Sequence, residues 1–176
     1  ISTMTISYGH GLSATPMHLA AAFSTIANGG RKISPTLLKQ DGPNYGAQVL
    51  SPFVAREMND MLRKVVTDGT ASFGDVAGYS VGGKTGTADK PKARGGYYKD
   101  KVIASFASVF PTDNPQYVLI VTLDEPEIYT MGENRRSAGW TAVPVAAELI
   151  NRVAPLLGLR PNVEPGKLAG ITLTSN

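Results

Sequence analysis

The chain has 176 residues, of which 42% are hydrophobic and 18% charged, and its formal net charge at pH 7 is +3. This is typical of about one globular domain with a substantial core, and a weak positive charge favours small anionic ligands over nucleic acid. The absence of cysteine excludes disulfides and thiolate metal sites, and two histidines without ligand spacing predict no metal centre.

The N-terminal region is predicted to be a loop followed by a helix. Residues 1–13 are polar and contain glycine, which favours a loop, and the role of His10 in it is left open. A helix is expected over residues 15–28, because Thr15 suits the cap, Pro16 suits the first turn and two glycines follow the last turn.

A small hairpin and a second helix should come next. Residues 33–38 favour a short or edge strand because they contain a proline, and residues 47–50 could pair back with them. Ser51 and a following proline predict the start of a helix that runs to about residue 66. Its predicted apolar face is Val54, Met58, Met61, Leu62 and Val65.

Three strands and a third helix are expected in the second half of the chain. The strands are predicted over residues 79–88, 102–110 and 117–123, with both faces of the last covered because it is almost wholly apolar. A helix is predicted over residues 140–157. Its predicted apolar face is Val145, Leu149, Val153 and Leu156.

Two irregular loops are expected between these elements. Residues 89–101 are basic and contain two tyrosines, which could suit nucleic acid, but a solvated loop is the commoner cause of such a charge run. No nucleic-acid partner is therefore predicted. Residues 125–139 form the second loop, and the roles of Arg135, Arg136 and the nearby Trp140 are left open.

The order of elements predicts the fold class. The strands are joined by connections too short for parallel crossovers, so an antiparallel meander is expected. The chain is thus predicted to be an α/β protein of the α+β type, with an antiparallel sheet covered by helices. Because the apolar last strand needs further strands beside it, the chain is expected to be a piece of a larger domain.

One short stretch carries most of the chemistry. Residues 78–88 contain four glycines, Lys84 and two threonines, Thr85 and Thr87, on either side of Gly86. Glycine lets backbone approach a ligand closely, and hydroxyls at alternate positions face the same side of a strand. This combination suits an anion held beside a carbonyl group.

Three known motifs overlap there. Residues 78–85 satisfy G-x-x-x-x-G-K-T of a phosphate-binding loop, residues 78–82 satisfy G-x-S-x-G of a hydrolase nucleophile, and residues 84–87 are K-T-G-T. The first requires a helix that opens at the lysine, but glycines and a proline follow. The second requires a histidine after Ser80, but both histidines precede it. A K-T-G-T edge strand is the preferred interpretation, with a nucleotide hydrolase as an alternative.

Several segments together resemble class B penicillin-binding proteins. They are residues 8–16, 24–30, 65–71 and 82–88. The nearest type is the FtsI-like, division-specific peptidoglycan D,D-transpeptidase. The resemblance covers nearly the whole chain, and the tail beyond Arg160 is its least informative part. The resemblance implies the fold shared by these transpeptidases and serine β-lactamases, present here as the C-terminal part of one domain. Residues 1–70 would be its helical part with the hairpin, residues 71–157 its strands and covering helix, and residues 158–176 a tail.

The resemblance also implies roles for the K-T-G-T residues. Lys84, Thr85 and Thr87 would bind the substrate carboxylate, Gly86 would leave space for the substrate, and the Thr87 N–H would form half of an oxyanion hole. Lys84 and Thr87 are the expected catalytic residues. The family's S-x-x-K nucleophile and S-x-N motifs do not occur in the chain. They would lie upstream, so this chain alone is not expected to be acylated.

The implied ligands and location follow from the family. The substrate would be the D-Ala-D-Ala end of a peptidoglycan stem peptide, β-lactam antibiotics would inhibit, and no cofactor or metal is expected. The remainder of the transpeptidase domain and divisome proteins are the expected protein partners. The chain would belong to a periplasmic domain of a protein anchored in the inner membrane. A non-catalytic β-lactam sensor or divisome scaffold is a further alternative.

Overall fold

The computed structural model describes residues 2–7, 12–42 and 44–162. Predictions on His10 and on residues 163–176 lie outside these ranges. The elements in chain order are α1 (Ser2–Ile6), α2 (Pro16–Ala27), β1 (Arg31–Ile33), β2 (Tyr45–Gln48), α3 (Pro52–Thr67), a 3-10 turn (Ser72–Gly74), β3 (Gly82–Pro91), β4 (Tyr97–Phe110), β5 (Tyr117–Asp124), β6 (Ile128–Thr130), β7 (Glu133–Arg135) and α4 (Ala142–Leu156).

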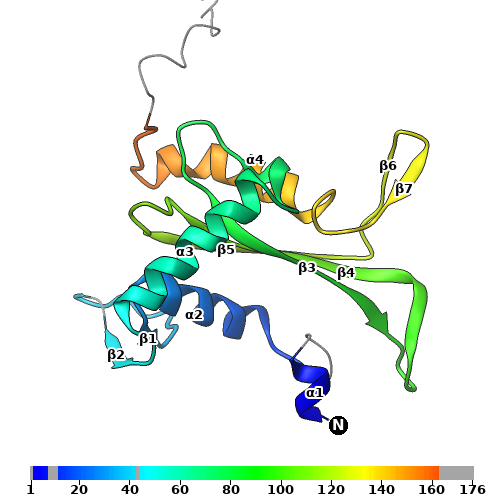
Figure 1. Cartoon of the computed structure of the whole chain (residues 1–176), viewed down its shortest axis with the longest axis horizontal. Helices are drawn as coiled ribbons and strands as arrows, with labels where there is room; N and C mark the ends of the chain where they lie inside the picture. The colour runs from blue at the N-terminus through cyan, green and yellow to red at the C-terminus, as the bar shows by residue number, and fades with distance from the viewer. Residues whose placement is uncertain (1, 8–11, 43, 163–176) are drawn as a thin grey trace, which may run out of the picture.

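A three-stranded antiparallel sheet forms the centre of the molecule, in the order β3-β4-β5. Figure 1 shows α4 on one face of this sheet and α2 on the other, while α3 begins beside α2 and runs across β3 towards α4, so helices cover both faces. Within the described residues, β3 pairs with β4 alone and lies at one edge. The predicted fold class and the meander are confirmed.

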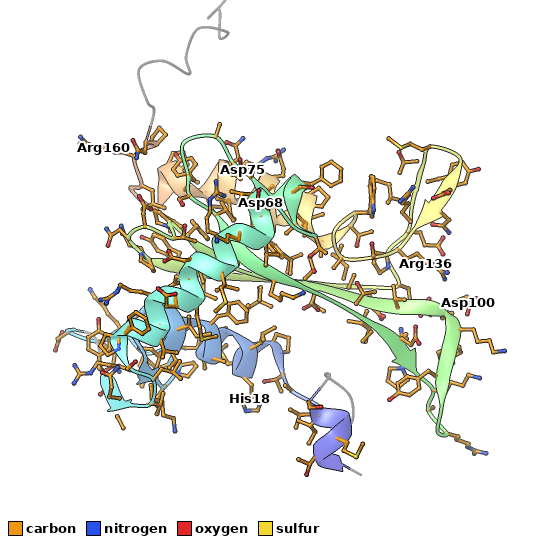
Figure 2. All side chains as sticks on the ribbon, viewed as in Figure 1. His18, Asp68, Asp75, Asp100, Arg136 and Arg160 are labelled. Atoms are coloured by element: carbon orange, nitrogen blue, oxygen red, sulfur yellow. The ribbon has the colours of Figure 1, made fainter. Side chains whose placement is uncertain are left out.

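The first two long helices begin where their caps predict. The Thr15 hydroxyl accepts a hydrogen bond from the His18 N–H at 3.2 Å, and the Thr15 N–H donates to His18 Nδ1 at 3.4 Å. Ser51 Oγ likewise accepts from the Val54 N–H at 3.2 Å. Figure 2 shows His18 at the start of α2. These bonds satisfy N–H groups that have no partner inside the helix, so His18 has a structural role.

The apolar face predicted for α3 is partly right, because Leu62 is buried and Val65 packs against the main core, whereas the face predicted for α4 is wrong in rotation. On α3 the buried residues are Ala55, Asn59, Leu62 and Val66. On α4 they are Ala142, Val143, Ala146, Ile150 and Ala154. Met61 and Leu156, which were predicted to be buried, are exposed. In both helices, two sets of residues recur at helical spacing and could form the buried face. The set with more small residues is the one that packs, because small side chains let the helix approach the sheet closely.

The irregular loops are shorter than predicted. Residues 89–101 largely extend β3 and β4 into a long hairpin, and residues 128–135 form the β6–β7 hairpin. Residues 2–6, expected in a loop, form α1. The backbone groups of these residues form hydrogen bonds with the neighbouring strand. A polar, glycine-containing sequence does not indicate such partners, so the strands were not predicted. The last strand is also less covered than predicted, since Thr122 is exposed.

The main core lies between the sheet and α4. Phe106 of β4 is fully buried there against Val66 from the end of α3 and Val143 and Ala146 from α4. A second cluster joins Phe110 and Ile150 to the segment before β3. The packing of the neighbouring strands and α4 therefore supports β3 on one side. None of the helices formed by the described residues has the length and apolar character needed to span a membrane.

Candidate active-site cleft

The K-T-G-T residues lie in the middle of the edge strand β3. Lys84 pairs with Ala107, Thr85 with Phe106 and Thr87 with Ala104. No helix begins at Lys84, so a phosphate-binding loop, which needs its N–H groups at a helix start, is not formed. The alternative of a nucleotide hydrolase is therefore wrong.

The hydrolase-nucleophile alternative also fails. Ser80 is half-buried, and its hydroxyl forms a hydrogen bond with the Thr112 hydroxyl. The residues after it continue into β3 and not into a helix. Ser80 therefore lacks the sharp turn into a helix that exposes the serine of such enzymes.

A cleft of about 430 Å³ opens beside the edge strand. Thr85 and Thr87 both line it, as their alternate positions predict. The cleft is completed by residues from the turn after α3 and from the segment before α4: Gly69, Thr70, Ser72, Phe73, Ser137, Gly139 and Trp140. Hydroxyl groups from three separate segments thus meet at one place.

Some hydroxyl hydrogens in the cleft are not needed for the hydrogen bonds between the described residues. Thr87 Oγ1 accepts the Ala138 N–H at 2.9 Å, which leaves its own hydrogen free to donate. Thr70 Oγ1 and Thr85 Oγ1 are 2.8 Å apart and share one hydrogen bond, so one of their two hydrogens also remains. Lys84 Nζ donates to the Thr85 carbonyl at 2.9 Å and to Thr85 Oγ1 at 3.3 Å. Such an array of donors suits a carboxylate.

Three glycines shape the strand around Lys84. A Cβ on Gly82 would lie 2.9 Å from the Arg63 nitrogen of α3, and one on Gly83 would lie 2.5 Å from the Ala107 oxygen. These two glycines therefore allow α3 and β4 to pack closely against β3. A Cβ on Gly86 would meet nothing within 4 Å, so the space that a side chain would occupy at this position is open.

Neighbouring elements fix the strand in place. Arg63 of α3 donates to the Val81 carbonyl at 2.8 Å and forms an ion pair with Asp75 at 2.9 Å. At the other end of the motif, the Thr87–Ala138 hydrogen bond ties β3 to the segment before α4. Sequence patterns did not single out Thr70 or Phe73 as cleft residues, because only the turn after α3 brings them to Thr85.

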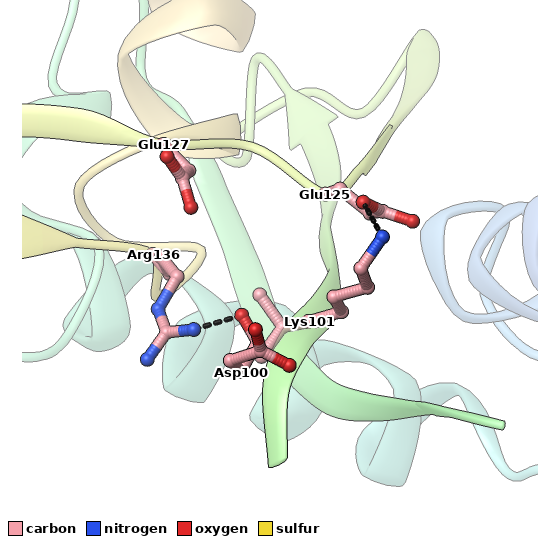
Figure 3. A pocket seen from close by; sticks show the side chains of 6 residues that line it. Asp100, Lys101, Glu125, Glu127 and Arg136 are labelled. Atoms are coloured by element: carbon pink, nitrogen blue, oxygen red, sulfur yellow. Dashed lines mark hydrogen bonds and ion pairs between the residues drawn. The ribbon is translucent and has the colours of Figure 1, made fainter. Parts of the chain in front are cut away.

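A second cavity of about 400 Å³ is lined by charged groups at the base of the β6–β7 hairpin (Figure 3). Lys101 pairs with Glu125 at 2.7 Å, Lys90 pairs with Glu125 at 2.8 Å, and Arg136 donates to the Asp100 carbonyl. Hydrogen bonds from Lys101 and Lys90 lower the pKa of Glu125. Hydrogen bonds to Asp124 and then Glu125 raise the pKa of Lys90, and the hydrogen bond to Glu125 raises the pKa of Lys101. These charges mainly satisfy one another, so we assign them a structural role.

This network predicts a pH dependence of stability. Because the folded-state pKa of Glu125 is lowered, its stabilisation is present above the unfolded pKa and is lost as the pH falls through the folded value. Glu125→Gln should therefore flatten the decline in melting temperature between about pH 5 and pH 3, by a small amount because the pairs are exposed. Thermal unfolding across that range measures it. Glu57→Gln on α3 is the control, and an unchanged slope for Glu125→Gln would contradict the assignment.

The comparisons with known proteins agree with one another. The family of penicillin binding protein transpeptidase domains matches residues 1–151. A probable peptidoglycan D,D-transpeptidase FtsI from Caulobacter vibrioides is 37% identical over 170 residues, which cover 90% of this chain and 28% of that protein. Stage V sporulation protein D of Bacillus subtilis is 32% identical over 173 residues, covering 92% of this chain and 26% of that protein.

Solved structures give the same result. The apo transpeptidase domain of Burkholderia pseudomallei penicillin-binding protein 3 matches with a TM-score of 0.80 and 37% identity, over 91% of this chain and 47% of that one. Penicillin-binding protein 3 of Mycobacterium tuberculosis, complexed with ampicillin, matches with a TM-score of 0.74 and 28% identity, over 94% and 40% of the two chains. The chain thus spans less than a third of those curated relatives and less than half of these solved chains. With a family match over most of its length, the chain belongs to the penicillin-binding protein transpeptidase family.

Proposed function

We propose that this chain is the C-terminal part of the transpeptidase domain of a serine D,D-transpeptidase that cross-links peptidoglycan stem peptides. The observation that carries the proposal is the position of Lys84, Thr85 and Thr87 at the edge of the sheet that the described residues form, with both threonines lining a cleft. In this proposal residues 1–70 are the helical part of the domain, residues 71–157 its strands and covering helix, and residues 158–176 a tail.

The edge strand would bind the D-Ala-D-Ala end of the stem peptide as an added strand. Lys84 and the free hydroxyl hydrogens of Thr85 and Thr87 would bind its terminal carboxylate. Gly86, whose front is open, would allow the peptide to approach, and the Thr87 N–H would donate to the oxyanion. Lys84 and Thr87 are the catalytic residues of this proposal.

The nucleophile would come from a segment outside this chain. Its serine oxygen would bond to the carbonyl carbon of the penultimate D-Ala, and the terminal D-Ala would leave as an amine that takes up a proton. An amine of a neighbouring stem would then attack the ester carbonyl carbon and form the cross-linking amide. The ester C–O bond would break, and one proton of the amine would pass to the serine oxygen. Neither step requires a cofactor.

Inhibition and location follow from the same proposal. A β-lactam would form the same ester with the serine, and a mycobacterial neighbour has been solved in complex with ampicillin. The names of the FtsI relatives support a role in peptidoglycan synthesis. The proposal extends this role to cell division, with divisome proteins as partners. The domain would lie in the periplasm, carried by a membrane-anchored protein.

Covalent labelling of the full-length protein by a fluorescent penicillin tests the proposal. A labelled band that disappears after competition with unlabelled ampicillin supports it, and turnover of a D-Ala-D-Ala peptide supports the enzyme. Absence of labelling in the folded full-length protein would overturn it. Labelling without any turnover would indicate a β-lactam sensor or scaffold.

The role of the Thr87 hydroxyl gives a second prediction. Thr87→Val removes the hydroxyl donor at nearly constant volume, so the rate of acylation should fall roughly tenfold, as expected for one hydrogen bond to a charged group. Stopped-flow or gel-based labelling of the full-length protein measures it. Thr87→Ser should keep most of the rate, and Thr122→Val on β5 is the matched control. Equal rates for Thr87→Val and the control would contradict the role.

A further inference from the structure

Two aromatic rings lie in the same cleft as the threonine hydroxyls. Phe73, from the turn after α3, and Trp140, from the segment before α4, both line it. Their ring centroids are 5.0 Å apart with an interplanar angle of 54°, and Phe73 is 52% exposed. A tilted aromatic pair at this distance is a stable arrangement, and here one of its rings remains open to solvent.

The Trp140 ring is held in a fixed place relative to the hydroxyls. The backbone N–H of Trp140 donates to the Ser137 carbonyl at 3.0 Å, and the backbone N–H of Ala138 in the same turn donates to Thr87 Oγ1 at 2.9 Å. The Arg135 guanidinium carbon lies 4.5 Å from the centroid of the Trp140 ring, which adds a cation–π contact. The aromatic wall and the carboxylate-binding hydroxyls are therefore parts of one preorganised surface.

The wall has the chemistry of an apolar subsite beside an anion site. The hydroxyls suit a carboxylate, whereas the faces of Phe73 and Trp140 suit carbon-rich or planar groups. A molecule whose carboxylate is bound by Thr85 and Thr87 would place the group attached next to that carboxylate against the rings.

We propose that Phe73 and Trp140 form a specificity-determining subsite for the substituent adjacent to the ligand's carboxylate. This inference rests on the proposed function, because it takes the carboxylate to be bound at Lys84, Thr85 and Thr87. The subsite favours ligands with a planar or bulky apolar group at that position over ligands with hydrogen there. It acts on which acyl donors and β-lactams react, not on the acylation chemistry itself.

Acylation rates of the full-length protein with two β-lactams test the inference. The two compounds share one nucleus and differ only in the substituent next to the carboxylate-bearing carbon, which is an aromatic ring in one and hydrogen in the other. The wild type should react faster with the aromatic compound. Trp140→Ala should reduce the ratio of the two rates by roughly fivefold to tenfold, as expected for the loss of an aromatic contact. Trp140→Phe should retain most of the ratio, and Tyr129→Ala, an exposed aromatic on β6, should leave it unchanged.

Fluorescence offers a second readout. Trp140 is the only tryptophan of the chain, so the difference between the emission of the wild type and of Trp140→Phe reports on this residue. Acylation by the aromatic compound should change that difference signal more than acylation by the hydrogen compound. Equal changes would count against the contact.

The remaining outcomes separate the subsite from the proposed function. If the wild type reacts with neither compound, the proposed function fails and the inference fails with it. If the wild type reacts but Trp140→Ala lowers both rates equally or leaves the ratio unchanged, the aromatic pair is structural only and the inference alone is overturned. Should Trp140→Ala not fold, Phe73→Leu, which keeps an apolar side chain but removes a ring, provides the same ratio test.

Discussion

Replacing Lys84 with alanine is expected to lower acylation of the full-length protein by a fluorescent penicillin by about two orders of magnitude. Of the described residues that line the cleft, none is charged, so in the proposed function Lys84 beside it would supply a positive charge for the carboxylate. Its ammonium lies within 3.3 Å of Thr85 Oγ1 and so acts on the same group as the hydroxyls. Hydrogen bonds to charged groups contribute about 1.5–3 kcal/mol, which corresponds to roughly 10-fold to 100-fold or more in rate.

Matched lysines make this test specific. Lys99→Ala on β4 removes a positive charge from the distant part of the β3–β4 hairpin and should leave labelling unchanged. Lys84→Arg should recover only part of the rate, because a planar guanidinium cannot replace a compact ammonium beside Thr85. Full labelling of a folded Lys84→Ala protein would show that the edge strand does not bind the ligand's carboxylate.

Replacing Phe106 with alanine is expected to lower the free energy of unfolding by about 3–5 kcal/mol, the usual cost of a large cavity in a core. Phe106 is fully buried between the sheet and α4, and it belongs to the same core cluster as Val143 and Ala146. It also lies against β3, because a Cβ on Gly83 would come within 2.6 Å of this ring. The cavity should therefore loosen β3 as well as the core.

Thermal and urea unfolding of the full-length protein measure this effect. Phe53→Ala is the matched control, because Phe53 on α3 is 62% exposed in this structure. Penicillin labelling of Phe106→Ala should also fall at temperatures where the protein remains folded, since Thr85 pairs directly with Phe106 across the sheet. A loss of stability no larger than that of Phe53→Ala would contradict the assignment of the core.

Sequence patterns correctly predicted the elements that depend on interactions between residues close together in the chain. Thr15 and Ser51 cap their helices with their own hydroxyls, and the short connections between apolar segments leave an antiparallel meander as the simplest arrangement. The alternate threonines of K-T-G-T line one cleft because side chains alternate along any strand. These features need no knowledge of distant residues.

Other features depended on residues far apart in the chain. The rotation of α4, and in part that of α3, was predicted wrongly because periodicity offers two stripes and only the sheet selects between them. The hairpin over residues 89–101 was predicted as a loop because its hydrogen bonds come from the partner strand. Thr70 and Phe73 gave no sequence signal as site residues, because their roles arise from the path of the turn after α3.

By itself, the sequence determined the helix starts, the antiparallel order of the strands and the family of the K-T-G-T segment, since each depends on neighbouring residues or on a motif. Only the tertiary structure decided that Lys84 lies on a sheet edge and not at a helix start, and that Thr70, Phe73 and Trp140 meet Thr85 and Thr87 in one cleft. The physical reason is that a binding surface forms where separate segments pack, and packing is fixed by volume, burial and hydrogen bonding across the whole fold.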